Sequence, residues 1–248
     1  MDQPTPSPPS SARLRRLLPV ALGYVAGYVD GCTFVALFGL FVAQVTGSFV
    51  AVGGLAARSP SALLTLLAIP AFVLGAAVAS AISTISRHRG LRASPILLGL
   101  ECVLLAAMLA TALLAGQMQN PDQPAALCIG MFGLSAMGVQ NAFVGLHVKG
   151  APSTNVMTTN TGNLAIDAAH LLTVGWLARL RSAGFAPADA EQARSRLAKT
   201  APVVLAFLAG TVCGTLACRA WGFVCLALPL ALLSTFATLA ARRKFDSD

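Results

Sequence analysis

Polar residues interrupt two otherwise apolar stretches of the chain in the same order, and these side chains could bind a solute. The first stretch carries Gly27-Tyr28-Val29-Asp30 and then Thr46-Gly47-Ser48, and the second carries Gly138-Val139-Gln140-Asn141 and then Thr161-Gly162-Asn163. A threonine that caps a short helix leaves backbone N–H groups free, and these attract anionic groups. The expected substrate or ion ligands are Asp30, Gln44, Thr46, Gly47, Ser48, Gln140, Asn141, Thr161, Gly162 and Asn163.

The Thr-Gly turns also have a structural interpretation. Small and hydroxyl residues in membrane helices allow tight packing and hydrogen-bond to nearby carbonyls. For Thr46 and Ser48 the sequence does not separate this interpretation from a binding site, and for Asn163 it favours the site.

Four ionisable side chains form a candidate proton relay, since such groups inside a bilayer are costly and mark functional sites by default. They are Asp30, Glu101, Asp167 and His170. Each also has a structural alternative. Asp30 could hydrogen-bond to the second stretch, Glu101 could pair with Arg92, and Asp167 and His170 could lie on the polar side of an interfacial helix.

Composition defines the class of protein. The 248 residues are 56% hydrophobic and only 10% charged, whereas a soluble domain carries about 25% charged residues. Six continuous apolar runs are long enough to cross a bilayer as helices, and their continuity argues against a β-barrel. The expected spans are Leu17 to Leu40, Ser61 to Ser86, Ser94 to Gly116, Ala125 to Leu146, Ala201 to Cys218 and Trp221 to Ala241.

The positions of the basic residues give the orientation. The net charge is +8, and with these spans fifteen of the seventeen basic residues fall on one side, leaving Arg58 and Arg219 opposite. By the positive-inside rule, the N and C termini are both expected in the cytoplasm. Basic clusters beside spans attract anionic membrane lipids, and no aromatic-basic motif indicates nucleic-acid binding.

Two short segments, 41–57 and 154–177, do not fit as full crossings. If both crossed, the arginines between spans two and three would move outside, so re-entrant or half-helical segments are expected, although spanning ones stay open. The expected fold is therefore an all-α membrane protein with two inverted three-helix repeats. Its expected parts are a disordered cytoplasmic tail (1–16), repeat 1 (17–116), an external loop (117–124), repeat 2 (125–241) with a cytoplasmic connector (179–200), and a cytoplasmic C-terminal tail (242–248).

Small residues recur at helical spacing in each half. Gly75 with Ala79, and Gly210 with Gly214, allow helices to approach closely, so they are expected to pack across the pseudo-twofold axis or in a homodimer. The six cysteines show no C-x-x-C pair and no histidine at metal spacing, so we expect buried small hydrophobes, no metal and no cofactor.

The two polar stretches together resemble the YoaK family of bacterial multipass membrane proteins. The resemblance rests on the Gly-x-x-Asp and Gly-x-Gln-Asn motifs with the two Thr-Gly turns that follow them, and it covers nearly all the chain after the N-terminal tail. Ser48 stands where relatives often carry Asn, so a pair of amides is not implied. The resemblance implies a six-span protein of the bacterial inner membrane and supplies no substrate.

The leading hypothesis is a small secondary transporter or permease, proton-coupled through Asp30, that moves a small solute, with an anionic one favoured. The alternative is a non-transporting accessory or sensor protein that binds a lipid or a partner subunit. An enzyme is not expected, because no metal-ligand set, phosphate loop or nucleophile-histidine pair is recognisable.

Overall fold

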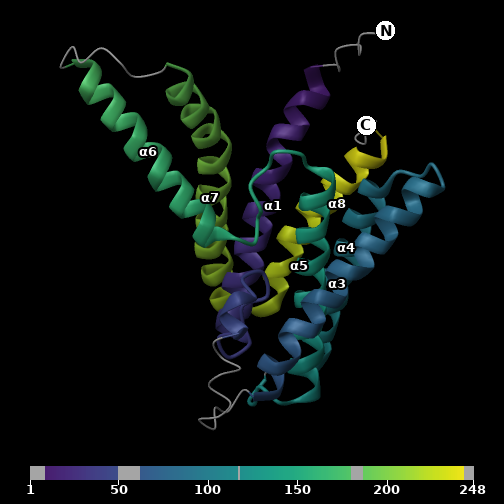
Figure 1. The fold of residues 1–248 in the computed structure, drawn as a ribbon. Helices are drawn as coiled ribbons and strands as arrows, with labels where there is room; N and C mark the ends of the chain where they lie inside the picture. Colours follow the sequence, from purple (N-terminus) through teal and green to yellow (C-terminus); the bar gives the residue numbers. More distant parts are fainter. Residues whose placement is uncertain (1–8, 50–61, 117, 180–186, 243–248) are drawn as a thin grey trace.

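The computed structural model describes residues 9–49, 62–116, 118–179 and 187–242, and every element assigned to them is helical (Figure 1). The elements are α1 (Pro9–Ala36), α3 (Ala62–His88), α4 (Ala93–Ala115), α5 (Pro124–His147), α6 (Met157–Arg179), α7 (Pro187–Trp221), the 3-10 helix η2 (Gly222–Leu226) and α8 (Ala227–Arg242).

Five helical stretches are long and apolar enough to cross a membrane, which confirms the expected class of helical membrane protein. The last of them contains α7, η2 and α8, which the sequence analysis divided into two spans, so the count of six is not confirmed. The five stretches are Arg16–Ala36, Leu63–His88, Ala93–Ala115, Pro124–His147 and Asp189–Arg242.

Corresponding helices of the two halves run in opposite directions. Figure 1 shows α1 descending and α5 rising, α3 rising and α7 descending, and α4 descending and α8 rising. The packing also exchanges partners between the halves, because α1 packs on α7, α3 packs on α5, and α4 packs on α8.

Glycines make the two exchanged pairs unusually close. A Cβ at Gly27 of α1 would overlap the carbonyl oxygen of Phe207 in α7, and a Cβ at Gly138 of α5 would overlap that of Phe72 in α3. These are corresponding positions of the two polar stretches and of the segments that follow them. The same local sequence therefore produces the same helix contact twice.

The second set of small residues completes these contacts within the chain. A Cβ at Gly75 would overlap the carbonyl oxygen of Ser135, and one at Gly210 or Gly214 would overlap a carbonyl oxygen of α1. Ala79 is also fully buried. These faces are thus occupied by helices of the same chain, and a homodimer through them stays a prediction.

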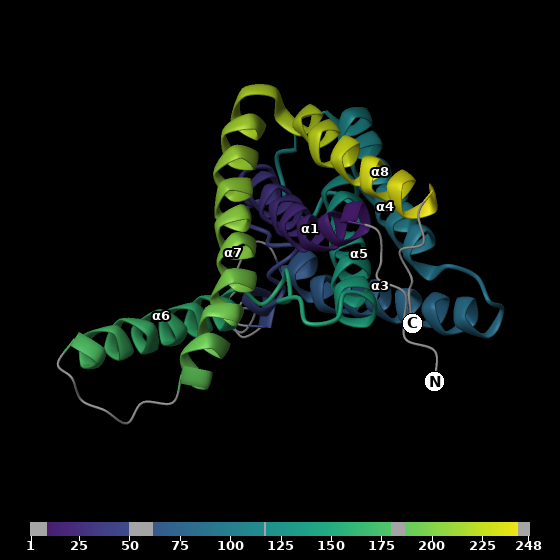
Figure 2. The same ribbon diagram turned by 90° about the horizontal axis from the view of Figure 1, so that it is seen from above.

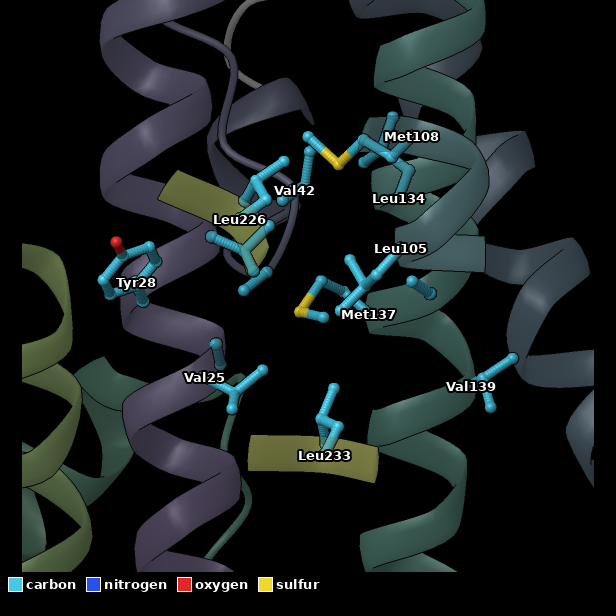
Figure 3. Close-up of a cluster of buried hydrophobic side chains, with 14 of the residues drawn as sticks. Val25, Tyr28, Val42, Leu105, Met108, Leu134, Met137, Val139, Leu226 and Leu233 are labelled. Carbon is cyan, nitrogen blue, oxygen red and sulfur yellow. The ribbon is translucent and has the colours of Figure 1, made fainter. Parts of the chain in front are cut away.

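The apolar core lies between α1, α4, α5 and the chain around η2. Figure 3 shows Val25 of α1, Leu105 of α4 and Met137 of α5 with Leu226 and Leu233 around one region. All five side chains are at most 1% exposed. The core holds together helices from both halves of the sequence, so neither half is an independent domain.

Two boundaries differ from those expected. α1 begins at Pro9, so part of the expected disordered tail 1–16 is helical, while residues 1–8 lie outside the described residues. α7 begins at Pro187 and continues past Pro202 to Trp221, so most of the expected connector 179–200 belongs to a long helix. Its first turns are rich in strong helix formers, which extend the helix beyond the apolar run.

α6 and the first half of α7 form an arm. α6 packs along α7, and in Figures 1 and 2 this pair projects away from the other helices. Ile166, Leu172 and Trp176 of α6 are each more than 60% exposed. The arm therefore presents large apolar side chains on its outer surface.

Candidate functional site

The carboxylate of Asp30 holds the non-helical segment that follows α1. Its Oδ1 accepts hydrogen bonds from the backbone N–H groups of Val42 at 2.7 Å and Ala43 at 2.6 Å, and its Oδ2 accepts one from Gln44 at 3.2 Å. The chain reverses just before, at Phe38 and Gly39, both with positive φ. A group of successive N–H donors in a turn is an anion-binding nest.

This arrangement changes the expected role of Asp30. The side chain is 2% exposed, and three donors of its own half saturate it. The structural alternative that was expected, a hydrogen bond to the second stretch or to Asn141, is wrong. The segment after α1 folds back, and its backbone N–H groups occupy the carboxylate instead. The backbone donors of residues 42–44 bind the chain's own anion.

In the second half, amide and hydroxyl side chains hold the segment between α5 and α6. Gln140 donates from Nε2 to the carbonyl oxygen of Leu22 at 3.2 Å and to Oγ1 of Thr154 at 2.9 Å. Ser153 donates to Oδ1 of Asn141 at 3.2 Å, and Asn155 donates to the carbonyl oxygen of Met137 at 3.1 Å. Gln140 thereby ties the segment to α1 as well as to α5.

The second Thr-Gly motif is not a break in the chain. Thr161, Gly162 and Asn163 lie in the second turn of α6 and are exposed. The irregular segment comes earlier, around Pro152. The sequence analysis missed Ser153 and Thr154, whose side chains form the hydrogen bonds that fix this segment. A glycine and a proline at positions 150 and 152 were the available signal, because both disfavour continuation of a helix.

The first Thr-Gly motif starts a short helical segment at Thr46. Thr46 and Gly47 are exposed, Gln44 is half-buried and Ser48 is buried. Gly47 and Ser48 border a cavity of about 210 Å³ whose other walls come from residues 37–41 and from α3. The candidate ligands of the first half are therefore divided between the Asp30 nest and this cavity. Residues 50–57 of the expected re-entrant segment lie outside the described residues.

Glu101 of α4 is the ionisable side chain with the most unusual surroundings. It is fully buried, and neither carboxylate oxygen has a hydrogen-bond partner among the described residues. The expected pairing with Arg92 is wrong, since Arg92 donates to the carbonyl oxygen of Ala241 at 3.2 Å. A buried carboxylate without partners strongly favours its protonated form.

Asp167 belongs to the α6–α7 arm. Arg196 of α7 donates to both of its oxygens, with a shortest N···O distance of 2.6 Å. The hydrogen bonds from this guanidinium lower the pKa of Asp167 below its ordinary value. No hydrogen bond among the described residues joins Asp30, Glu101 and Asp167, and His170 is half-buried on α6. The expected relay is therefore not a connected path in this conformation.

These features define the class of protein: a helical membrane protein whose halves each fix a non-helical segment with buried polar side chains. The chain belongs to the family described as "Protein of unknown function (DUF1275)", whose model matches residues 18–239. This agrees with the resemblance to an uncharacterised family, although the YoaK name itself is not confirmed. No curated protein and no solved structure matches the chain.

Proposed function

We propose that the protein is a small proton-coupled secondary transporter built from two inverted halves. The observation that carries the proposal is Glu101, a fully buried carboxyl group without a hydrogen-bond partner among the described residues. Buried ionisable groups in spanning helices are expensive and typically mark ion or proton pathways.

The opposite directions of corresponding helices and the repeated glycine contacts support the inverted halves. In transporters of this type, one group of helices moves against the other around a site near the bilayer midplane. The exchanged partners make the interface between α1 and α7 equivalent to that between α5 and α3. If the two halves exchanged conformations, the α1–α7 interface would take the arrangement that the α3–α5 interface has now, and the reverse. The protein could therefore adopt two related arrangements.

Glu101 would carry the proton. It would exchange this proton only when helix movement admits water to α4. Oε1 of Gln140, on the neighbouring helix α5, is also buried without a hydrogen-bond partner among the described residues. This amide oxygen is a natural acceptor for a solute, and Asn141 lies beside it in the sequence.

The hydrogen bonds that Asp30 accepts also restrict the chemical type of solute that could bind. An anion bound at residues 42–44 would have to displace Asp30, so a small solute that donates hydrogen bonds to Gln140 fits better than the anionic solute favoured by the sequence. Thr161, Gly162 and Asn163 would contact such a solute only if α6 moved. We place the protein in the cell membrane with the start of α1 and the end of α8 on the cytoplasmic side, which the one-sided basic residues support.

The test is proton flux in liposomes that contain the purified chain and an internal pH-sensitive dye. Amino acids, sugars, nucleosides, organic acids and amines are added outside in turn, and at least one class is expected to move protons. Glu101→Gln removes the titrating group with little change in shape and should abolish this movement. Glu191→Gln is the matched control, because Glu191 is the only other glutamate and is exposed.

Two results would contradict the proposal. Proton flux that persists at the wild-type rate in Glu101→Gln would show that Glu101 is not the proton carrier. If correctly folded protein moved no protons with any of the solute classes, the proposal that it is a proton-coupled transporter would be wrong.

A lipid-binding accessory protein is the second candidate, and one feature favours it. A groove of about 780 Å³ is lined by apolar residues of α7, η2 and α8 together with Tyr24 and Tyr28 of α1. Its lining suits an acyl chain. Native mass spectrometry should then detect a retained lipid, which Leu216→Trp would displace by filling the groove.

A further inference from the structure

Three cysteines that are far apart in the sequence meet at the junction of α1, α7 and η2. They are Cys32, Cys218 and Cys225, and their Sγ atoms all lie within 4.8 Å of one another. The Sγ atoms of Cys32 and Cys225 are 3.6 Å apart, although the two residues are 193 positions apart in the chain. Their exposures are 0%, 6% and 6%, so all three thiols are buried.

The surrounding fold fixes the positions of these thiols. Gly222, with a φ of +58°, turns the chain after α7 so that Cys225 returns toward Cys218. Tyr28 donates from its hydroxyl to the carbonyl oxygen of Cys225 at 3.1 Å and so holds η2 against α1. The close approach of Gly31 to the backbone of α7 sets the distance between Cys32 and Cys218. The cluster is therefore preorganised by contacts that do not involve sulfur.

The chemistry of the cluster selects a soft metal ion. Three sulfur ligands without a carboxylate or imidazole in the group suit Cu(I) or zinc and do not suit magnesium or calcium. Three sulfurs around one ion at about 2.3 Å would lie about 4.0 Å apart in a trigonal plane. The thiols already lie within 4.8 Å of one another, so small side-chain rotations would bring them to this geometry.

We propose that Cys32, Cys218 and Cys225 bind one soft, thiophilic metal ion, of which Cu(I) is the biological example. Cu(I) accepts three thiolates in a plane, whereas structural zinc takes four ligands. Each sulfur–metal bond that forms replaces an S–H bond, and the released proton passes to water. The copper keeps its oxidation state, so no oxidant or reductant is consumed.

The groove described above gives the ion a route to the cluster. Cys225 lines the groove, so its sulfur belongs to both the groove wall and the cluster. Cys213 lines the same groove and is exposed, so it offers a thiol along the path. This proposal does not depend on transport by Glu101, because the two sites share no residue.

The experiment measures binding of Cu(I) to the full-length chain in detergent, without oxygen and with a non-thiol reductant. The copper is supplied from a complex with a chromophoric Cu(I) chelator, so that transfer is read from the loss of colour. One Cu(I) per chain is expected to be retained after desalting. X-ray absorption of the wild-type complex should show a first shell that contains sulfur alone.

Variants identify the ligands. Cys32→Ser, Cys218→Ser and Cys225→Ser should each raise the Kd for Cu(I) at least about 100-fold, beyond the 10- to 100-fold typical of an outer-shell change. The matched control replaces the two cysteines outside both the cluster and the groove, Cys102 and Cys128, with serine and should keep one tight site. Size-exclusion profiles establish that each variant is folded.

Three outcomes would overturn the proposal. Wild-type protein that retains no copper against the chelator has no such site. A first shell with nitrogen or oxygen in place of sulfur assigns the ion elsewhere. Tight binding that survives all three cluster substitutions but disappears in the control variant shows that the other cysteines are the ligands. The first two outcomes use the unmodified chain and do not depend on the folding of a variant.

Discussion

Each half of the molecule fixes a non-helical segment after its first helix, and the two halves use different polar side chains to do so. In the first half, one carboxyl group, that of Asp30, accepts hydrogen bonds from three consecutive backbone N–H groups after α1. In the second half, neutral groups of Gln140, Asn141, Ser153 and Thr154 share the same task after α5. A carboxylate acts alone because it accepts several strong hydrogen bonds, whereas an amide must recruit partners that both donate and accept.

A second comparison, between Asp30 and Glu101, shows that a buried carboxyl group in a spanning helix can have different surroundings. Asp30 is saturated by donors and fixes the fold, while Glu101 has no hydrogen-bond partner among the described residues. Both are acidic residues within apolar helices, and only their surroundings distinguish the anchor Asp30 from Glu101, which we propose as the proton carrier.

The largest loss of stability is expected when the carboxyl group of the first half is replaced by an amide, as in the second half. Asp30→Asn replaces one acceptor oxygen with an NH2 donor, so at least one backbone N–H group of residues 42–44 then faces a donor instead of an acceptor. The free energy of unfolding should fall by roughly 3 kcal/mol, as for the loss of hydrogen bonds to a buried charge. Thermal unfolding in detergent, followed by size exclusion, measures this change.

Asp122→Asn is the control for that substitution, because Asp122 is an exposed acid outside the spans. An Asp30→Asn protein that is as stable as this control would contradict the role of Asp30 as the anchor of its half.

A second substitution tests whether the two halves are equivalent in packing. Gly27→Ala and Gly138→Ala should each lower stability by about 1–3 kcal/mol, because the added methyl group overlaps a carbonyl oxygen of the facing helix. Gly99→Ala has no atom within 4 Å and should be neutral or stabilising. Unequal effects of the first two variants would show that the halves differ in packing as well as in polar chemistry.

A smaller effect is expected in the neutral network of the second half. Thr154→Val keeps the shape of the side chain but removes its bonds to Gln140 and Asn155. We expect a loss of about 1–2 kcal/mol, less than for Asp30→Asn, since the bonds removed are between neutral groups. Hydrogen exchange should rise in residues 148–156 and stay unchanged in residues 42–44. A rise in both segments would mean that the two halves unfold together.

The smallest effect is expected in the pH dependence of the stability of the α6–α7 arm. The pKa of Asp167 is lowered by Arg196, so this carboxylate contributes stability above its unfolded pKa and loses that contribution as pH falls through the lower folded value. Proteolysis of the α6–α7 arm should therefore accelerate only in that acidic range. Asp167→Asn should abolish this dependence, and an unchanged profile would show that the ion pair does not hold the arm.

Much of the fold could be predicted because hydropathy is a local property of the sequence. The expected spans that correspond to α3, α4 and α5 match these helices within a few residues. Asp30, Gln140 and Asn141, which the sequence analysis selected, take part in hydrogen bonds in the structure, while their role as ligands stays a prediction. The boundaries of α1 and α7 differ from those expected, since both helices begin in the polar sequence that precedes the apolar run. Thr161-Gly162-Asn163 was misread because a Thr-Gly pair is tolerated inside a helix as well as at its start.

The sequence by itself determined the class of membrane protein, most spanning segments and the asymmetry of basic charge, because each follows from the residues of a single short window. Only the tertiary structure decided that Asp30 is bound by its own half, that Glu101 has no hydrogen-bond partner in the part of the chain that the structure describes, and that three distant thiols meet. The reason is physical. The environment of a buried polar atom is set by whichever segments pack around it, and for the three thiols those segments come from opposite ends of the chain.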